Sequence, residues 1–144
     1  MLLILSSLYL VQILSGGGSG GGGSAGPATV TISRTLDGNG AVLDVYTSAP
    51  VFIPNTCTIT QVVLDADQVG SLNVIVEKAT YTTGTPTYTT ISSGLALSSA
   101  RSLKDSTLTG WSTGISPNSL VRFSITATAT FITKAGLTLV MSCS

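Results

Sequence analysis

Apolar and polar residues alternate along most of this chain with a period of two, which is the pattern of β-strands whose two faces differ. The longest run covers residues 120–132. Here Val121 and every second residue up to Phe131 are apolar, whereas each residue between them is Arg, Ser or Thr. The alternation therefore predicts one long strand with an apolar face and a polar face.

Shorter runs of the same kind predict further strands over residues 29–33, 41–46, 51–53, 56–65, 71–79 and 137–142. Turn signals separate them at residues 37–40 (DGNG), 66–70, 117–118 and 134–136. No segment after Ser15 shows a helical face. We therefore expect an all-β protein, an antiparallel β-sandwich or jelly roll of about seven or eight strands.

Three details of this pattern make sharper predictions. Pro50 and Pro54 bracket residues 51–53, which suits an edge strand or the start of a strand. Residues 80–99 are rich in Thr and Ser and are expected to form an exposed excursion with some extended pairing. In residues 56–65 one predicted face carries Cys57, Ile59, Gln61 and Val63, and the other carries Thr58, Thr60, Val62 and Leu64.

The front of the chain differs from the rest, because residues 1–33 carry no charged side chain. A secretory signal peptide would need a positive start, and no Lys or Arg precedes the apolar run. A membrane span would need ~20 apolar residues, and Ser6, Ser7 and Gln12 interrupt this shorter run. We favour a segment that anchors the chain in an assembly, through Leu2, Leu3, Ile4, Leu5, Leu8, Tyr9, Leu10, Val11, Ile13 and Leu14.

The sequence thus divides into an apolar anchor at residues 1–15, a linker at 16–27 and a β-domain at 28–144. Residues 16–26 consist of Gly, Ser and Ala, and such chains behave as flexible coils. Eleven residues of this kind span about 18–20 Å when relaxed. We expect this linker to hold the β-domain away from the surface that receives the anchor.

Charge and cysteine content narrow the function classes. Charged residues make up only 8% of the chain and the net charge is zero, which disfavours nucleic-acid binding and suits a packed, multi-subunit structural protein. With no His in the sequence, a Ser–His–Asp or Cys–His site and a zinc site are not expected, nor is any cofactor. Cys57 and Cys143 are interpreted first as buried free thiols, with a disulfide as the alternative.

Few residues are candidates for chemistry. Asp65 and Asp67 are interpreted as solvated turn acids, the alternative being a weak Ca²⁺ site helped by Asn73 or Glu77. No other acid–base arrangement stands out, so we do not expect an enzyme. The candidate contact surface consists of Tyr81, Tyr88 and Trp111, although Trp111 is favoured as a core or inter-subunit residue. Tyr81 and Tyr88 would hold a glycan or pack against a neighbouring subunit.

Several stretches resemble a small β-sandwich module of tailed-bacteriophage virion proteins. The similar stretches, between residues 30 and 142, are DGNG (37–40), FIPNTCTITQVVLDAD (52–67), DSTLTGWSTGI (105–115), LVRFSI (120–125) and LTLV (137–140). The resemblance implies a fibre, tail or head-decoration role and no catalytic residues. This chain departs from the family pattern in its second cysteine, Cys143, and in its short apolar N-terminus.

Together these features predict a phage virion structural protein, a short fibre or decoration subunit assembled in the host cytoplasm. Its expected partners are further copies of itself, with a trimer favoured, other virion proteins through residues 1–15, and host-surface glycans. The alternative is a secreted or surface-anchored carbohydrate-binding module with a signal peptide. That alternative also predicts a bridge between Cys57 and Cys143.

Overall fold

The computed structural model describes residues 9–14 and 26–144, and in this part of the chain all regular structure is β-strand. The strands are β1 (Tyr9–Leu14), β2 (Ala28–Asp37), β3 (Tyr46–Thr47), β4 (Val51–Ile53), β5 (Cys57–Thr80), β6 (Thr89–Thr90), β7 (Ala96–Asp105), β8 (Gly114–Ile115), β9 (Ser119–Ile125) and β10 (Lys134–Cys143). Every pairing between them is antiparallel. The predicted all-β, antiparallel fold class is confirmed.

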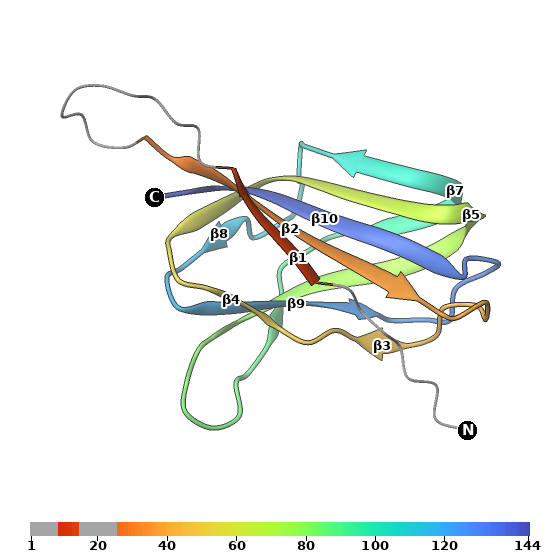
Figure 1. The fold of residues 1–144 in the computed structure, drawn as a ribbon, viewed down its shortest axis with the longest axis horizontal. Coiled ribbons are helices and arrows are strands. Elements are labelled where there is room, and N and C mark those ends of the chain that lie inside the picture. The colour runs from red at the N-terminus through yellow and green to blue at the C-terminus, as the bar shows by residue number, and fades with distance from the viewer. Residues whose placement is uncertain (1–8, 15–25) are drawn as a thin grey trace.

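The strands form one strongly curled sheet whose two layers face each other across the core (Figure 1). The first layer has the order β1-β2-β10-β5, with β7 and β8 on the other side of β5. The second layer joins β9 to the last part of β5, and β3 and β4 pair with the outer side of β9. β5 is 24 residues long and belongs to both layers, so it is the strand along which the sheet curls.

The alternation of β5 changes phase near its start, which corrects the predicted faces of residues 56–65. Ile59 is buried as expected. After Ile59 the register between β5 and β10 shifts by one residue, as at a β-bulge. After the bulge Val62 and Leu64 are the buried residues, and Gln61 and Val63 lie on the other face. Two adjacent polar residues, Thr60 and Gln61, fill the irregular position.

The predicted turn at residues 66–70 is wrong, because β5 runs through it without a break. Its pairing with β7 is irregular between Asp65 and Leu72, and the strand bends there from the first layer to the second. At the bend Ser71 pairs with Thr130 as an isolated bridge. The bend also brings Gly70 against the backbone carbonyl of Thr130.

The predicted strand over residues 120–132 is too long, since β9 ends at Ile125. The residues that follow form a loop that bonds to two other segments, with Ala129 N–H donating to the Leu43 carbonyl and Thr130 N–H to the Ser71 carbonyl. Phe131 is 68% exposed with φ of 66°, whereas Ile132 is buried. The apolar alternation in the sequence therefore extends beyond the end of β9. The apolar residues after Ile125 do not all point into the core, as the exposed Phe131 shows.

Two other predicted segments are corrected. Residues 41–46 form a loop tied to residues 129–132 instead of a strand, and only Tyr46 enters β3. The stretch 80–99, predicted to be an exposed excursion, is exposed up to Thr90 apart from partly covered Pro86 and Tyr88. After Thr90, the side chains of Ile91, Leu95 and Leu97 are buried in the core. They are buried because β6 and β7, within residues 89–105, pair antiparallel with β5.

Cys57 and Cys143 form a disulfide, so the free-thiol interpretation is wrong and the alternative is confirmed. The two residues are direct partners in the ladder between the start of β5 and the end of β10. Their Cα atoms are 4.0 Å apart although 86 positions separate them in the sequence. The bridge therefore fastens two strands of the first layer at the same end.

Candidate contact surface

The outer face of the second layer begins with Phe52 on β4. Pro50 and Pro54 flank this three-residue strand, whose one pairing partner within residues 9–14 and 26–144 is β9, as predicted for an edge. Val51 and Ile53 point into the core, so strand alternation turns Phe52 to the opposite face. The ring is 48% exposed and lies across from Leu120 of β9.

Tyr81 packs on this ring directly after the end of β5. The ring centroids are 5.5 Å apart and the planes meet at 75°, which is an edge-to-face arrangement. The backbone N–H of Tyr81 donates to the Asn118 carbonyl, so its position at the strand end is fixed. Tyr81 remains 57% exposed, and the pair presents aromatic surface to solvent.

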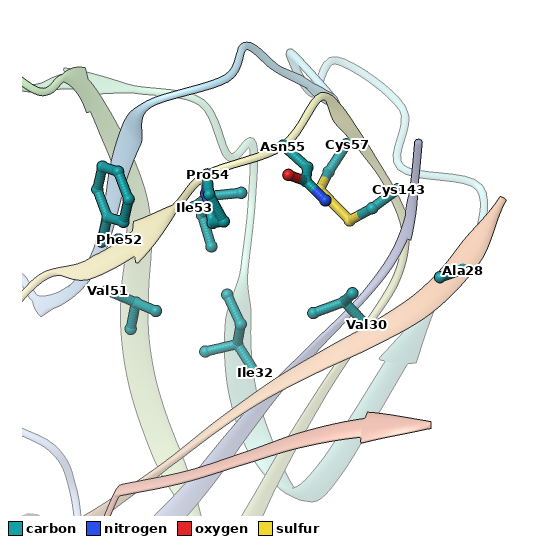
Figure 2. A pocket seen from close by; sticks show the side chains of 10 residues that line it. All are labelled: Ala28, Val30, Ile32, Val51, Phe52, Ile53, Pro54, Asn55, Cys57 and Cys143. Carbon is teal, nitrogen blue, oxygen red and sulfur yellow. A yellow bond between two sulfur atoms is a disulfide. The ribbon is translucent and has the colours of Figure 1, made fainter. Parts of the chain in front are cut away.

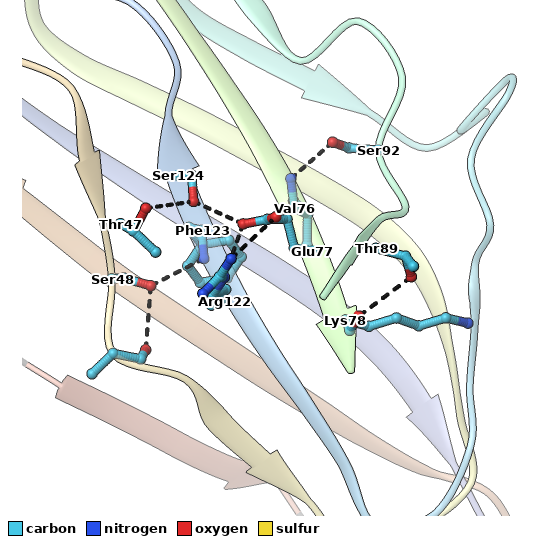
Figure 3. Close-up of polar contacts among 11 residues, drawn as sticks. Thr47, Ser48, Val76, Glu77, Lys78, Thr89, Ser92, Arg122, Phe123 and Ser124 are labelled. Carbon is cyan, nitrogen blue, oxygen red and sulfur yellow. Dashed lines mark hydrogen bonds and ion pairs between the residues drawn. The ribbon is translucent and has the colours of Figure 1, made fainter. Parts of the chain in front are cut away.

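Tyr88 lies over the neighbouring part of the same face. Its ring centre is 3.6 Å from the guanidinium carbon of Arg122, a cation–π contact. Arg122 projects from the outer face of β9, and Glu77 is its direct partner on β5. The Arg122 Nε–H donates to a Glu77 carboxylate oxygen at 2.9 Å, and a second guanidinium nitrogen donates to the other oxygen at 3.3 Å (Figure 3).

Further hydroxyl groups complete the network around Glu77. The Ser124 hydroxyl donates to the Glu77 carboxylate at 2.9 Å, and Ser124 and Thr47 share a hydrogen bond (Figure 3). The hydrogen bond from Arg122 holds the pKa of Glu77 below its usual value, with a further contribution from Ser124, and both outweigh the opposing effect of burial. Glu77 is therefore a structural carboxylate whose acceptors are engaged.

We call Phe52, Tyr81 and Tyr88 the aromatic surface. Together they cover the outer face of β9 with flat apolar rings beside a neutralised ion pair. Such a surface suits stacking on sugar rings or on the side chains of another subunit. It offers no free acid–base pair, because Arg122 and Glu77 bind each other.

The structure brings together only part of the predicted contact set. Tyr81 and Tyr88 belong to the aromatic surface, but Trp111 lies on the side of β5 away from β9. Its indole N–H donates to the Ser93 carbonyl at 3.1 Å, and its ring packs against the core. Phe52 is not among the predicted contact residues, although the Val-Phe-Ile alternation between two prolines is a signal that could have identified it.

The acids considered for a Ca²⁺ site are dispersed. Asp67 accepts a hydrogen bond from the Thr133 N–H at 3.2 Å and another from its hydroxyl at 2.5 Å. Burial works against ionisation of Asp67, yet these bonds keep its pKa below the usual value. Glu77 is held by Arg122 in the second layer, and no group of three potential ligands lies together among residues 9–14 and 26–144. Asp67 thus fastens the 126–133 loop to the bend of β5.

An apolar cavity of about 260 Å³ opens between β2 and β4, close to the disulfide (Figure 2). Val30 and Ile32 line it from the first layer and Val51 from the second, while the Phe52 ring points away from them. Further along the same side Arg34, which is buried, donates to the Ala49 carbonyl at 2.9 Å and links the layers. The cavity is about the size of one or two apolar side chains.

Part of the predicted anchor is placed by the structure. Residues 9–14 form β1, which pairs with β2 at the edge of the first layer from Tyr9 opposite Arg34 to Leu14 opposite Thr29. Residues 1–8, Ser15 and residues 16–25 of the predicted anchor and linker lie outside the described residues. The described part of the chain contains no helix long and apolar enough to cross a membrane.

Comparisons with known proteins give a weak structural likeness. No family model matches the chain, and no curated protein matches it. Among solved structures it is similar to a chain in the structure of infectious bursal disease virus, Gx strain, with 8% sequence identity and a TM-score of 0.32. That match covers 96% of this chain and 40% of the viral chain, so this chain spans well under half of it.

Proposed function

We propose that this chain is a structural protein of a bacteriophage particle, a short fibre or decoration subunit attached through its N-terminal segment. The observation that carries the proposal is β1, a strand from the charge-free apolar segment that pairs with β2 at the edge of the first layer. A strand held in this way can be accepted at another sheet edge while the core stays folded. The sequence resemblance to phage virion modules supports the same role.

The rest of the molecule suits a particle component. A neutral, charge-poor domain associates with neighbours at little electrostatic cost. The disulfide between Cys57 and Cys143 is compatible with the exterior of a released particle, where thiols are oxidised. We infer a homo-oligomer, with a trimer favoured because closed cyclic assembly covers sheet edges. In this proposal the chain is not an enzyme.

The aromatic surface is the proposed outward contact. Its exposed rings, Phe52 and Tyr81, sit beside Tyr88 on one face of the second layer. Aromatic faces of this kind stack on the apolar faces of sugar rings. Attachment to host-surface glycans is therefore the role proposed for this end of the protein.

Particle association tests the proposal. Phage particles would be purified from hosts that produce either the full chain or a chain starting at Ala28, and each would be quantified by mass spectrometry. We expect the full chain to copurify with particles at a constant copy number, and the shortened chain to stay unassembled with unchanged β-sheet circular dichroism. Equal incorporation of both chains would refute anchoring through the N-terminal segment, and absence of both from particles would refute the virion role.

The disulfide also favours a second candidate, a secreted or surface-anchored carbohydrate-binding module, because structural disulfides persist in oxidising compartments. This candidate requires export through an N-terminal signal. Intact-mass measurement of the protein from its native source separates the two. A chain processed near residue 15 and recovered without particles supports the secreted module, whereas an intact N-terminus in particles supports the virion subunit.

A further inference from the structure

The connection between β1 and β2 is much longer than their pairing needs. Leu14 pairs with Thr29, so the two strand ends are neighbours in the sheet. Two residues are enough to close an antiparallel hairpin, yet residues 15–28 separate these partners. Fourteen residues have a contour length of about 46–50 Å. A connection of this length is long enough for β1 to reach β2 of a neighbouring copy of the chain.

Most of the pairing contains nothing that restricts it to one chain. β1 reads YLVQIL, six residues of high β-propensity without charge, Pro or Gly. In the paired part of β2 the outward positions are Thr29, Thr31 and Ser33, which are uncharged. Natural edge strands usually carry charges, prolines or bulges that block pairing with other chains. Such a feature is present at one end of the ladder, where the buried Arg34 lies opposite Tyr9. The other five pairs carry no charge or proline, and the six-pair register is unbroken.

We propose that β1 is an exchangeable strand that pairs with β2 of its own chain in dilute solution and with β2 of a second copy where copies are crowded. The ladder has the same register in both arrangements, so local concentration decides between them. A short flexible linker gives a tethered strand an effective concentration in the millimolar range. Neighbouring copies compete once their own local concentration reaches that range.

Exchange links subunits without unfolding any of them. Among the residues whose burial the structure describes, the core is formed by residues 32–143 between the two layers, and the contacts of these residues with one another do not involve β1. Reciprocal exchange around a symmetric ring gives a closed oligomer. This inference deepens the proposed function and rests on it only for the crowding of copies in a particle.

Cysteine trapping between different copies tests the exchange. One copy carries Gln12→Cys and the other Thr31→Cys, because these residues are direct partners in the ladder. Facing residues in a sheet have Cα separations of about 4.5–5.5 Å, which a disulfide tolerates. The two proteins, of different mass, are mixed at micromolar and millimolar concentration, oxidised, and analysed on non-reducing gels with mass-spectrometric identification of the joined peptides.

At millimolar concentration we expect a disulfide between the two introduced cysteines, one in each copy, with a yield at least tenfold above that at micromolar concentration. Thr126→Cys, an exposed loop position, replaces Thr31→Cys as the control for random collision. A yield no higher than this control would overturn the exchange. Particle association of the full chain would be unaffected by that result, so the two proposals fail separately.

A second variant keeps the test independent of introduced cysteines. Deleting residues 16–26 leaves three residues between Leu14 and Thr29, which strains the pairing within one chain. Short, strained hinges favour strand exchange. We expect this variant to have a dimeric or larger native mass at concentrations where the full chain is monomeric, and a monomer with an intact fold would count against the exchange.

Discussion

At the scale of single residues, Gly70 has a neighbour that leaves no room for a side chain. A Cβ atom at this position would lie 2.1 Å from the Thr130 carbonyl oxygen and 2.8 Å from the Ile132 side chain. The backbone at the bend of β5 would have to move. We expect Gly70→Ala to lower the free energy of unfolding by about 1–3 kcal/mol, measured by urea unfolding followed through Trp111 fluorescence.

Gly136 is the matched control for this substitution. It also lies within a strand of the first layer, but no atom comes within 4 Å of an added Cβ. Gly136→Ala should therefore change the free energy of unfolding by no more than about 0.5 kcal/mol. Equal effects at Gly70 and Gly136 would contradict the close packing of the bend against the 126–133 loop.

Glu77 makes stability depend on pH in a definite direction. Its folded-state pKa lies below the ordinary value of 4.5, chiefly because Arg122 donates to the carboxylate. The stabilisation is therefore complete above pH 4.5 and is lost as the pH falls through the lowered pKa. We expect Glu77→Gln to cost on the order of 1–2 kcal/mol at about pH 7 and much less at about pH 3, measured by urea unfolding across this range.

The four shifted aspartates act in the same direction, so acid should destabilise the whole domain. Hydrogen bonds lower the pKa of Asp37, Asp44, Asp67 and Asp105 as well. Asp37→Asn is a control at a more exposed ion pair, with Lys134, and we expect it to have a smaller effect than Glu77→Gln. A difference between wild type and Glu77→Gln that stays constant from neutral pH to about pH 3 would contradict the role given to Arg122.

At the scale of elements, the disulfide closes a loop that contains most of the residues of the domain. It links β5 to β10 across a sequence separation of 86. In the chain-entropy model, a loop of this length is worth about 4–5 kcal/mol. We expect the double variant Cys57→Ser/Cys143→Ser to unfold with a free energy lower by about 3–5 kcal/mol, measured in urea.

Reductant provides the control for the disulfide prediction. It should lower the urea midpoint of the wild type towards that of the double variant and leave the variant unchanged. If reductant has no effect on the wild type, and its intact mass corresponds to two free thiols, the bridge does not contribute. Such a result would also remove the support that the disulfide gives to the secreted-module candidate.

β5 illustrates how far strand patterns can be predicted. The two apolar stretches, 56–65 and 71–79, are both predicted as strands, and apart from Thr56 both lie in β5. The polar residues between them are predicted as a turn because Asp, Gln and Gly are common in turns. Whether such residues close a turn or form a bend within a strand depends on their partners, here Thr130 and Thr133. Those partners lie more than fifty positions away in the sequence.

At the scale of the whole molecule, the aromatic surface and the loops at the opposite end of β9 offer a controlled comparison. Phe52 lies beside the start of β9, whereas Val45 adjoins Tyr46, which pairs with Ile125 at its end. If the aromatic surface binds host glycans, Phe52→Ala/Tyr81→Ala should weaken binding about tenfold or more. Binding would be measured on purified host-surface polysaccharide by calorimetry or biolayer interferometry.

Val45→Ala/Val69→Ala is the matched control, since both valines are exposed and neither belongs to the aromatic surface. It should leave glycan binding unchanged. The free energy of unfolding of the valine variant should change by no more than about 0.5 kcal/mol per site, because both valines are exposed. The aromatic variant loses the edge-to-face contact, which should cost about 0.5–1.5 kcal/mol, and should remain folded. Loss of binding in the valine variant alone would move the contact to the other end of the molecule.

Local patterns in the sequence predict the fold class, the edge character of β4 and most strand positions, because period-two alternation and proline placement are local properties of the chain. It also marked the apolar first segment, whose strand β1 the structure places beside β2. Long-range packing sets three features that these patterns do not predict: the bulge after Ile59, the end of β9 at Ile125 and the contact between Phe52 and Tyr81. These features depend on which distant segments become neighbours in the fold. A bulge or a loop contact changes the direction in which a side chain points, although the apolar and polar pattern of the surrounding sequence stays the same.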